Sequence, residues 1–214
     1  CMTIFASLGD ATDFYTLTAT TKESTAFANE VRGFCVEPQA TQIAYVDIES
    51  GGNFVDFGVL TGTSEQGASY TSSTRGIVHR NQSLSNVINY VTLMSTGNAL
   101  DFGDSTAGRY GGSSGSSATR GLFAGGWAPN VTNIIDYVTI ATLGNAIDFG
   151  DLTDERYGMS GSCSSKTRMV HMGGHTNPGP GVNIMDYNQF ATLGNSLDFG
   201  DLTGTINIAA ACSN

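Results

Sequence analysis

The chain has 214 residues, a formal net charge of −10, 13% charged residues and 28 glycines. The acidic balance argues against nucleic acid as a partner, because such binding depends on Lys and Arg that neutralise phosphates. No apolar run approaches the ~20 residues of a membrane helix, which argues against membrane insertion. Four cysteines without a C-x-x-C pair do not make a disulfide framework.

The chain repeats one sequence unit five times. Its clearest copy is NIIDYVTIATLGNAIDFGDLT at 133–153, with close copies at 86–106 and 183–203 and looser ones at 42–61 and 1–18. The Asp-Phe pair in this unit recurs at intervals of 43 to 50 residues, which predicts a solenoid or a propeller. Because the chain begins at Cys1 and its last segment stops in mid-repeat, we expect it to be an excerpt of a longer polypeptide.

Each unit is expected to hold four strands. A position that is Tyr in four copies and Met2 in the first lies 11 residues before the Asp of each Asp-Phe pair, which predicts a hairpin with Gly at its turn. Two more strands fit between that Asp and an Arg 19 or 20 residues later, and the first of these consists of small residues, as at 112–117. Small side chains suit the crowded inner strand of a propeller blade. We therefore predict an all-β fold, a β-propeller of four-stranded antiparallel blades.

The whole chain, 1–214, is expected to form a single propeller domain. Its repeat units run over about 14–56, 57–101, 102–148 and 149–198, with closing strands at 1–13 and 199–214. Two strands are left over at the start and one at the end, which predicts five blades with the last shared by both termini. Such closure would also protect strand edges from pairing with other chains. The alternative is an open arc cut from a propeller of six or seven blades.

Length variation is confined to one loop of the unit. The distance from the repeated Arg to the next Tyr grows from 13 to 15, 17 and 19 residues, so insertions fall between the second and third strands. Loops at equivalent positions gather on one face of a repeat protein, where ligands often bind. The longest loops, 127–132 and 175–181, give the candidate binding residues Trp127, Asn130, His175 and Asn177.

Two further sets of residues occupy constant repeat positions. The basic set is Arg32, Arg75, Arg120 and Arg168. The acidic set is Asp56, Asp101, Asp148 and Asp198. We expect a structural role for both, with each Arg side chain within hydrogen-bond range of a carboxylate or a main-chain carbonyl, because the planar guanidinium suits such contacts.

No pattern in the chain predicts catalysis. Asn145, Asp148 and Asp151 lie at three-residue steps and could offer oxygen ligands, but a calcium loop of the D-x-D-x-D-G type is absent, so turn capping is favoured. His171 and His175 lie four apart in a segment expected to run from strand into loop, which does not suit joint metal binding. No nucleophile elbow or phosphate loop occurs. We expect no cofactor, no metal and no enzymatic activity.

The order of features within the unit resembles a known motif. A strand ending in Gly-Gly, as at 121–126 and 169–174, is followed by a loop, a strand with Tyr, a hairpin to an aromatic residue and a Leu-Thr turn. This order resembles the kelch motif of kelch and galactose-oxidase-like propellers, with Asp-Phe where kelch repeats carry Trp. The unit D-Y-V-T-I-A-T-L-G-N-A-x-D-F-G-D-L-T is more closely similar to repeats in structural proteins of tailed bacteriophages, above all in residues 86–203.

The phage resemblance implies a non-enzymatic component of the virion, such as a tail, fibre or capsid-surface protein. Its implied partners are other virion proteins, a host-surface glycan or protein, and further copies of the same chain. One alternative is a cellular kelch-type interaction scaffold. The other is a carbohydrate-active or copper-oxidase-like propeller, whose copper site would require two Tyr, two His and a modified Cys. The repeated tyrosines Tyr45, Tyr90, Tyr137 and Tyr187 are instead expected to pack across strands.

Overall fold

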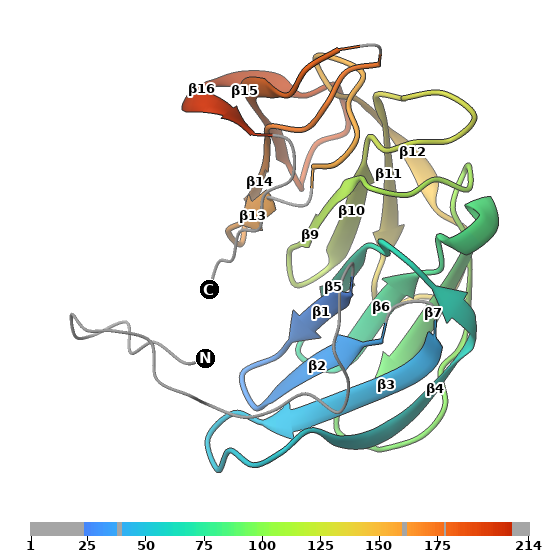
Figure 1. The fold of residues 1–214 in the computed structure, drawn as a ribbon. Coiled ribbons are helices and arrows are strands. Elements are labelled where there is room, and N and C mark those ends of the chain that lie inside the picture. Colours follow the sequence, from blue (N-terminus) through green and yellow to red (C-terminus); the bar gives the residue numbers. More distant parts are fainter. Residues whose placement is uncertain (1–23, 38–39, 160–161, 178, 207–214) are drawn as a thin grey trace.

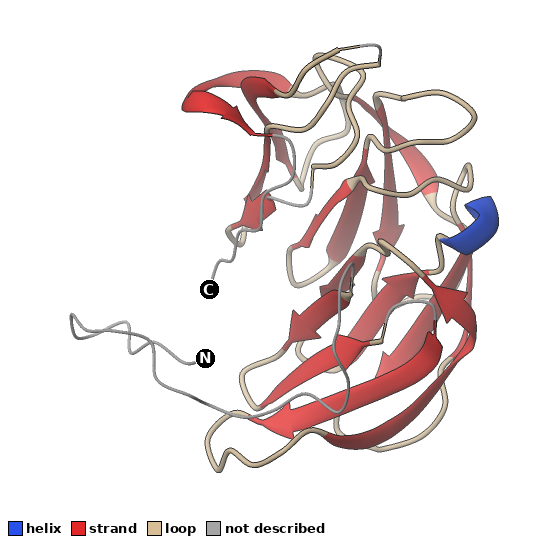
Figure 2. Ribbon diagram, in the orientation of Figure 1, coloured by secondary structure: helices blue, strands red, loops and turns tan. Residues whose placement is uncertain are grey.

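A computed structural model describes residues 24–37, 40–159, 162–177 and 179–206. These residues form four four-stranded antiparallel sheets, and within each sheet every strand pairs with the next one along the chain (Figures 1 and 2). The predicted all-β fold of four-stranded antiparallel units is confirmed. The closing strand expected at 1–13 lies outside the described residues. Of the closing strand expected at 199–214, residues 199–206 belong to the last strand of the fourth sheet, and 207–214 lie outside the described residues.

The strands follow the repeat. The first sheet has β1 (Thr25–Ala28), β2 (Arg32–Val36), β3 (Ala40–Asp47) and β4 (Val55–Ser64). The second has β5 (Ser69–Thr71), β6 (Arg75–His79), β7 (Val87–Thr92) and β8 (Leu100–Asp104). The third has β9 (Ser113–Ser116), β10 (Arg120–Ala124), β11 (Ile134–Thr139) and β12 (Ile147–Asp151). The fourth has β13 (Ser162–Ser164), β14 (Arg168–Met172), β15 (Val182–Gln189) and β16 (Leu197–Ile206).

The four sheets stand side by side in chain order and form an arc (Figure 1). Their first strands face the inside of the arc, where β1 contacts β5, β5 contacts β9 and β9 contacts β13. Their fourth strands lie on the outside. A 3-10 turn, η1 (Gln82–Leu84), lies in the connection between β6 and β7.

Side-chain hydroxyls join the first strands to one another. Ser114 Oγ donates to the carbonyl of Ser69 at 3.0 Å, and Ser162 Oγ donates to the carbonyl of Ser114 at 2.7 Å. Because each hydroxyl must reach the backbone of the neighbouring strand, only small residues fit here, as the sequence indicates. A parallel row of such bonds joins Ala28, Thr71, Ser116 and Ser164.

The hydrophobic core consists of layers between neighbouring sheets. Phe57 of the first sheet packs in one cluster with Leu93 of the second. Phe102 of the second sheet packs with Ile140 of the third, and Phe149 of the third packs with Phe190 of the fourth. Each sheet therefore depends on the next for burial of its apolar face.

A β-bulge recurs in the fourth strand of every sheet, at the Phe of the repeated Asp-Phe pair. In β12, Asp148 pairs with Asp136 and Gly150 pairs with Ile135, so Phe149 is the extra residue. Phe102 is its equivalent in β8. Phe102 and Phe149 are buried, whereas the Asp before each of them is exposed.

Candidate functional site

The connections between second and third strands, and between fourth and first strands, emerge at the same end of the four sheets. We call this end the loop face; among the described residues it comprises 65–68, 80–86, 105–112, 125–133, 152–159, 173–177 and 179–181. The predicted growth of the second-to-third connection therefore falls on one side of the molecule.

Four aromatic side chains lie next to one another on the loop face. They form a group that we call the aromatic row: Tyr110, Trp127, Tyr157 and His175. Antiparallel bridges join Tyr110 to Trp127 and Tyr157 to His175. The ring of Trp127 meets that of Tyr157 edge-on at 5.5 Å between centroids, and the ring of His175 stacks on Tyr157 at 5.1 Å. All four are half-buried, so each ring keeps some surface open to solvent.

Of the four binding residues predicted from the sequence, two belong to the aromatic row and two lie outside it. Trp127 and His175 both contact Tyr157, which brings the two predicted loops together. Asn130 and Asn177 are exposed elsewhere on the same two loops. Sequence reasoning missed Tyr110 and Tyr157, although the triplet Arg-Tyr-Gly at 109–111 and 156–158 was a signal for both.

Two buried arginines fix the backbone next to the aromatic row. Arg109 and Arg156, which directly precede Tyr110 and Tyr157, are fully buried. Arg109 Nη1 pairs with Asp136 Oδ2 at 3.0 Å, and Arg156 Nη2 pairs with Asp186. Burial lowers the pKa of each guanidinium, and the facing carboxylate opposes this effect. Neither arginine was foreseen from the sequence.

Each arginine also fixes the loop on the other side of the row. Arg109 Nε donates to the carbonyl of Gly125 at 2.8 Å, two residues before Trp127. Arg156 Nη1 donates to the carbonyl of Gly173 at 2.8 Å, two residues before His175. Each guanidinium therefore fixes the backbone segments that carry the two members of one aromatic pair. Such preorganisation lowers the entropy cost of binding.

A cavity of about 360 Å³ lies beside Tyr110. Its walls come from Glu65, Gln66, Asn81 and η1. Three residues in the described part of the chain have a positive φ without being glycine, namely Gln66 (49°), Ser83 (56°) and Leu84 (57°), and all three line this cavity. The Oε1 atom of Gln82 is buried there without a hydrogen-bond partner among the described residues.

The repeated arginines act between sheets. Each guanidinium lies over the ring of the repeated Tyr of its own sheet, for example Arg120 over Tyr137 at 5.0 Å. Arg32, Arg75 and Arg120 also donate to main-chain carbonyls of the next sheet, at Leu93, Ile140 and Phe190. Arg168 makes no such bond within the described residues, and the expectation of a bond for every repeated Arg is therefore met at three of the four positions.

The repeated aspartates do not pair with these arginines. All four are exposed on the outer strands. Asp56 accepts a hydrogen bond from Gln42, and Asp198 accepts one from the amide of Gly200 at 3.0 Å. Arg32 pairs with Asp47 instead, at 3.0 Å.

Candidate metal ligands are not brought together in the described part of the chain, where no group of three His, Cys, Asp or Glu residues could hold an ion. His171 is buried, with Nδ1 at 2.6 Å from Ser113 Oγ and Nε2 at 2.9 Å from Asn188 Oδ1. His175 lies in the aromatic row. The pair therefore does not share a site.

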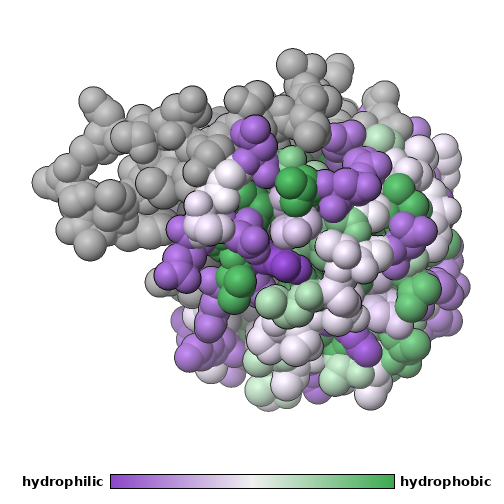
Figure 3. All heavy atoms as spheres, turned by 90° about the horizontal axis from the view of Figure 1, so that it is seen from below, coloured by the Kyte–Doolittle hydropathy of each residue, from purple (hydrophilic) through white to green (hydrophobic). Residues whose placement is uncertain are grey.

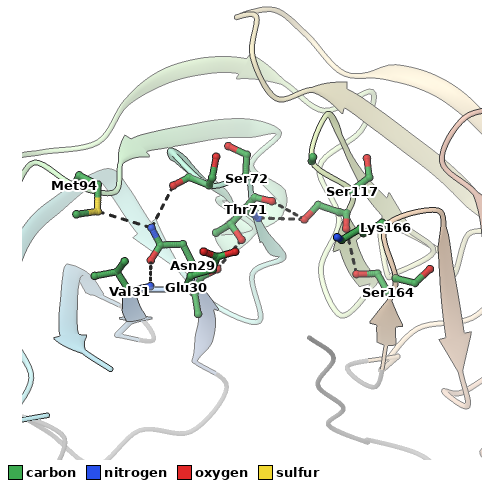
Figure 4. A pocket seen from close by; sticks show the side chains of 14 residues that line it. Asn29, Glu30, Val31, Thr71, Ser72, Met94, Ser117, Ser164 and Lys166 are labelled. Carbon is green, nitrogen blue, oxygen red and sulfur yellow. Dashed lines mark hydrogen bonds between the residues drawn. The ribbon is translucent and has the colours of Figure 1, made fainter. Parts of the chain in front are cut away.

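At the opposite end of the sheets, the turns between first and second strands surround a hollow of about 450 Å³ (Figure 4). Its hydroxyls accept hydrogen bonds within the turns to which they belong. Ser72 Oγ accepts from the amide of Arg75 at 3.2 Å, and Ser117 Oγ accepts from the amide of Arg120 at 3.1 Å. Asn29 accepts such bonds in the first sheet. The polar side chains of this hollow therefore cap the turns that surround it.

The surface shows no single dominant apolar patch on the face seen in Figure 3, where apolar side chains are separated by polar ones. Exposed apolar residues recur once per sheet at the start of the outer strand, at Val55, Leu100, Ile147 and Leu197. No helix in the described residues is long and apolar enough to span a membrane.

Four blade-like antiparallel sheets in an arc define the chain as a repeat protein of the all-β class. Among solved structures, it is similar to that of YjhT, with a TM-score of 0.74 over 88% of this chain and 68% of the YjhT chain. The sequence identity is 9%, so the likeness shows the fold alone. Neither a protein-family model nor the sequence of a curated protein matches the chain.

Proposed function

We propose that the chain is a β-propeller that acts by binding rather than by catalysis, as a tail, fibre or capsid-surface component of a phage virion. The propeller has five blades, the last shared by both termini. Support for the virion location comes from the repeat unit in 86–203, which resembles that of phage structural proteins. Its partners are other virion proteins and a host-surface glycan or protein.

The main support for a binding role is that the residues with strained backbone line an open cavity. Every positive-φ residue of the described chain that is not glycine lines the cavity beside Tyr110. Strained backbone of this kind costs about 1 to 3 kcal/mol per residue and clusters at binding sites. The aromatic row adjoins this cavity through Tyr110, which belongs to both.

The chemistry of the loop face favours a neutral saccharide. Aromatic faces beside a few amide and carboxylate groups match a ligand with both apolar ring faces and hydroxyls. The exposed charges at Asp154 and Glu155 are acidic, and the two buried arginines of the site are paired with carboxylates. An anionic glycan would therefore meet like charge at Asp154 and Glu155, whereas a neutral one would not. The remaining arginine of the loop face, Arg80, is half-buried and donates to Thr61 Oγ1 at 3.2 Å.

Two experiments test this function. Antibodies against the purified protein should label phage particles in electron microscopy; a protein found only in the cytosol of the host would contradict the virion location. The purified chain should also bind immobilised neutral polysaccharides from bacterial envelopes more strongly than polyanionic ones. Equal or absent binding to both sets would contradict the saccharide assignment.

A further inference from the structure

Two connections of the loop face enclose the cavity beside Tyr110. Residues 65–68 join β4 to β5, and residues 80–86 join β6 to β7. Asn81 is 3% exposed, and its Nδ2 donates to the carbonyl of Gln66 at 3.2 Å, which links the two connections. The walls of the cavity are therefore fixed by a buried side chain before any ligand binds.

The turn in the second of these connections is strained and closely packed. Ser83 and Leu84 both have a positive φ, of 56° and 57°. The carbonyl oxygen of Leu84 packs on Gly108, where an added Cβ would lie 1.7 Å from it. The amide of Ser85 donates to the carbonyl of Gln82 at 3.1 Å. Contacts on both sides of the turn thus stabilise its conformation and position the side chain of Gln82.

One hydrogen-bond acceptor of the cavity has no donor. Gln82 Oε1 is buried and makes no hydrogen bond with the described residues. A buried acceptor in this state is unfavourable, because it has lost its hydration without a replacement. A ligand that brings an N–H or O–H group to Gln82 removes this cost when it binds.

The surroundings of this acceptor favour one kind of donor. Tyr110 and Leu84 line the same cavity, and Leu84 is 40% exposed. An acylamino group of a sugar carries an N–H donor and a methyl group a few atoms apart. The N–H matches Gln82 Oε1, and the methyl group matches the two apolar side chains. A hydroxyl group supplies a donor without the apolar part.

The size of the cavity limits what it can hold. Its volume of about 360 Å³ lies near the lower end of the range of about 300 to 1,000 Å³ that is usual for small-molecule sites. One sugar residue suits this space better than a longer chain does. Further sugar residues can lie along the aromatic row, because Tyr110 lines the cavity and is bridged to Trp127.

We propose that the cavity is the subsite for an N-acetylated amino sugar within the neutral saccharide bound by the loop face. The N–H of the acetylamino group donates to Gln82 Oε1, and its methyl group packs on Leu84. The inference rests on the binding role proposed above and adds to it the residue that determines which sugar is preferred.

Titration with two matched sugars tests the subsite. N-acetylglucosamine differs from glucose only in the acetylamino group that replaces one hydroxyl. In an NMR titration of the unmodified protein, N-acetylglucosamine should bind about tenfold more tightly than glucose, as expected for one hydrogen bond and the burial of a methyl group. It should also shift the side-chain amide signals of Gln82. Equal affinity, or no binding of either sugar, would overturn the proposal.

Gln82→Leu tests the role of the acceptor. Because Gln82 Oε1 makes no hydrogen bond with the described residues, the urea unfolding midpoint should not fall. The affinity for N-acetylglucosamine should fall to that for glucose. Gln189→Leu is the matched control, an exposed change at the opposite end of the sheets that should leave the preference intact. A preference that survives Gln82→Leu would overturn the proposed contact.

Leu84→Asn tests the apolar contact independently of the acceptor. Asn tolerates a positive φ, so the change removes the apolar wall without adding backbone strain. The affinity should fall for N-acetylglucosamine but not for glucose, and equal losses would contradict the methyl contact. Failure of the subsite is distinguishable from failure of the proposed function. Binding of neutral envelope polysaccharide that is lost in Trp127→Ala supports the loop face even where the two sugars bind equally.

Discussion

Arg109 Nη1 lies 3.0 Å from Asp136 Oδ2, and the two side chains are 0% and 1% exposed. The pair joins the connection before β9 to strand β11, and Thr106 Oγ1 donates to the same carboxylate at 2.6 Å. The backbone that carries Tyr110 and Trp127 is thus fixed by one buried charge pair.

Removal of one partner of this pair should be costly. We expect Asp136→Ala to lower the free energy of unfolding by about 3 to 5 kcal/mol, because it leaves a buried guanidinium without a counter-charge. Urea denaturation measures the effect. Asp47→Ala is the matched control, since its pair with Arg32 is 44% exposed at the carboxylate and should contribute less than about 1 kcal/mol. Equal losses in the two variants would contradict the role of burial.

The stability should depend on pH through two buried histidines. Burial lowers the pKa of His171 from 6.5 to about 4 and that of His79 to about 3. The unfolded chain therefore binds protons below pH 6.5 that the folded chain does not, so stability falls as the pH decreases from 6.5 toward 4.

The slope of that loss can be measured directly. Each histidine should contribute at most about 1.4 kcal/mol per pH unit, and this limit is approached between pH 6 and 5. His171→Asn should reduce the pH dependence of the free energy of unfolding by the contribution of one histidine, whatever its effect on the absolute stability. An unchanged slope would contradict the assignment of a neutral buried imidazole.

The arginines between sheets should stabilise the arc. Arg120 lies over Tyr137 and donates to the carbonyl of Phe190 at 2.6 Å. We expect Arg120→Ala to lower the free energy of unfolding by about 2 to 3 kcal/mol, through loss of a charged hydrogen bond and a cation–π contact. Lys166→Ala, at an exposed position, should change it by less than about 0.5 kcal/mol. The variants can be compared by thermal and urea unfolding.

The repeat made the strands predictable, because five copies of one pattern separate constant strand positions from variable loops. The same approach failed for Arg109 and Arg156, which have no counterpart in the earlier repeats and so did not stand out. Asp136 directly follows the buried Ile135 in β11, and the burial of two consecutive residues is not what a simple alternation along a strand indicates.

The site was predicted in outline only. Insertions located the loop face and drew attention to Trp127 and His175, but the contact of both with Tyr157 depends on pairing between loops of different units. The strained residues Gln66 and Ser83 belong to early, divergent copies of the repeat. Their backbone conformation is set by tertiary contacts rather than by local preference.

The central claim, that the loop face is the recognition surface, is tested most directly by binding of the purified protein to immobilised neutral envelope polysaccharide. We compare the unmodified protein with Trp127→Ala and with Leu193→Ser, an exposed change at the opposite end of the sheets. The account predicts at least a tenfold loss of affinity for Trp127→Ala and unchanged affinity for Leu193→Ser. Binding that is unaffected by Trp127→Ala but lost in Leu193→Ser would contradict it.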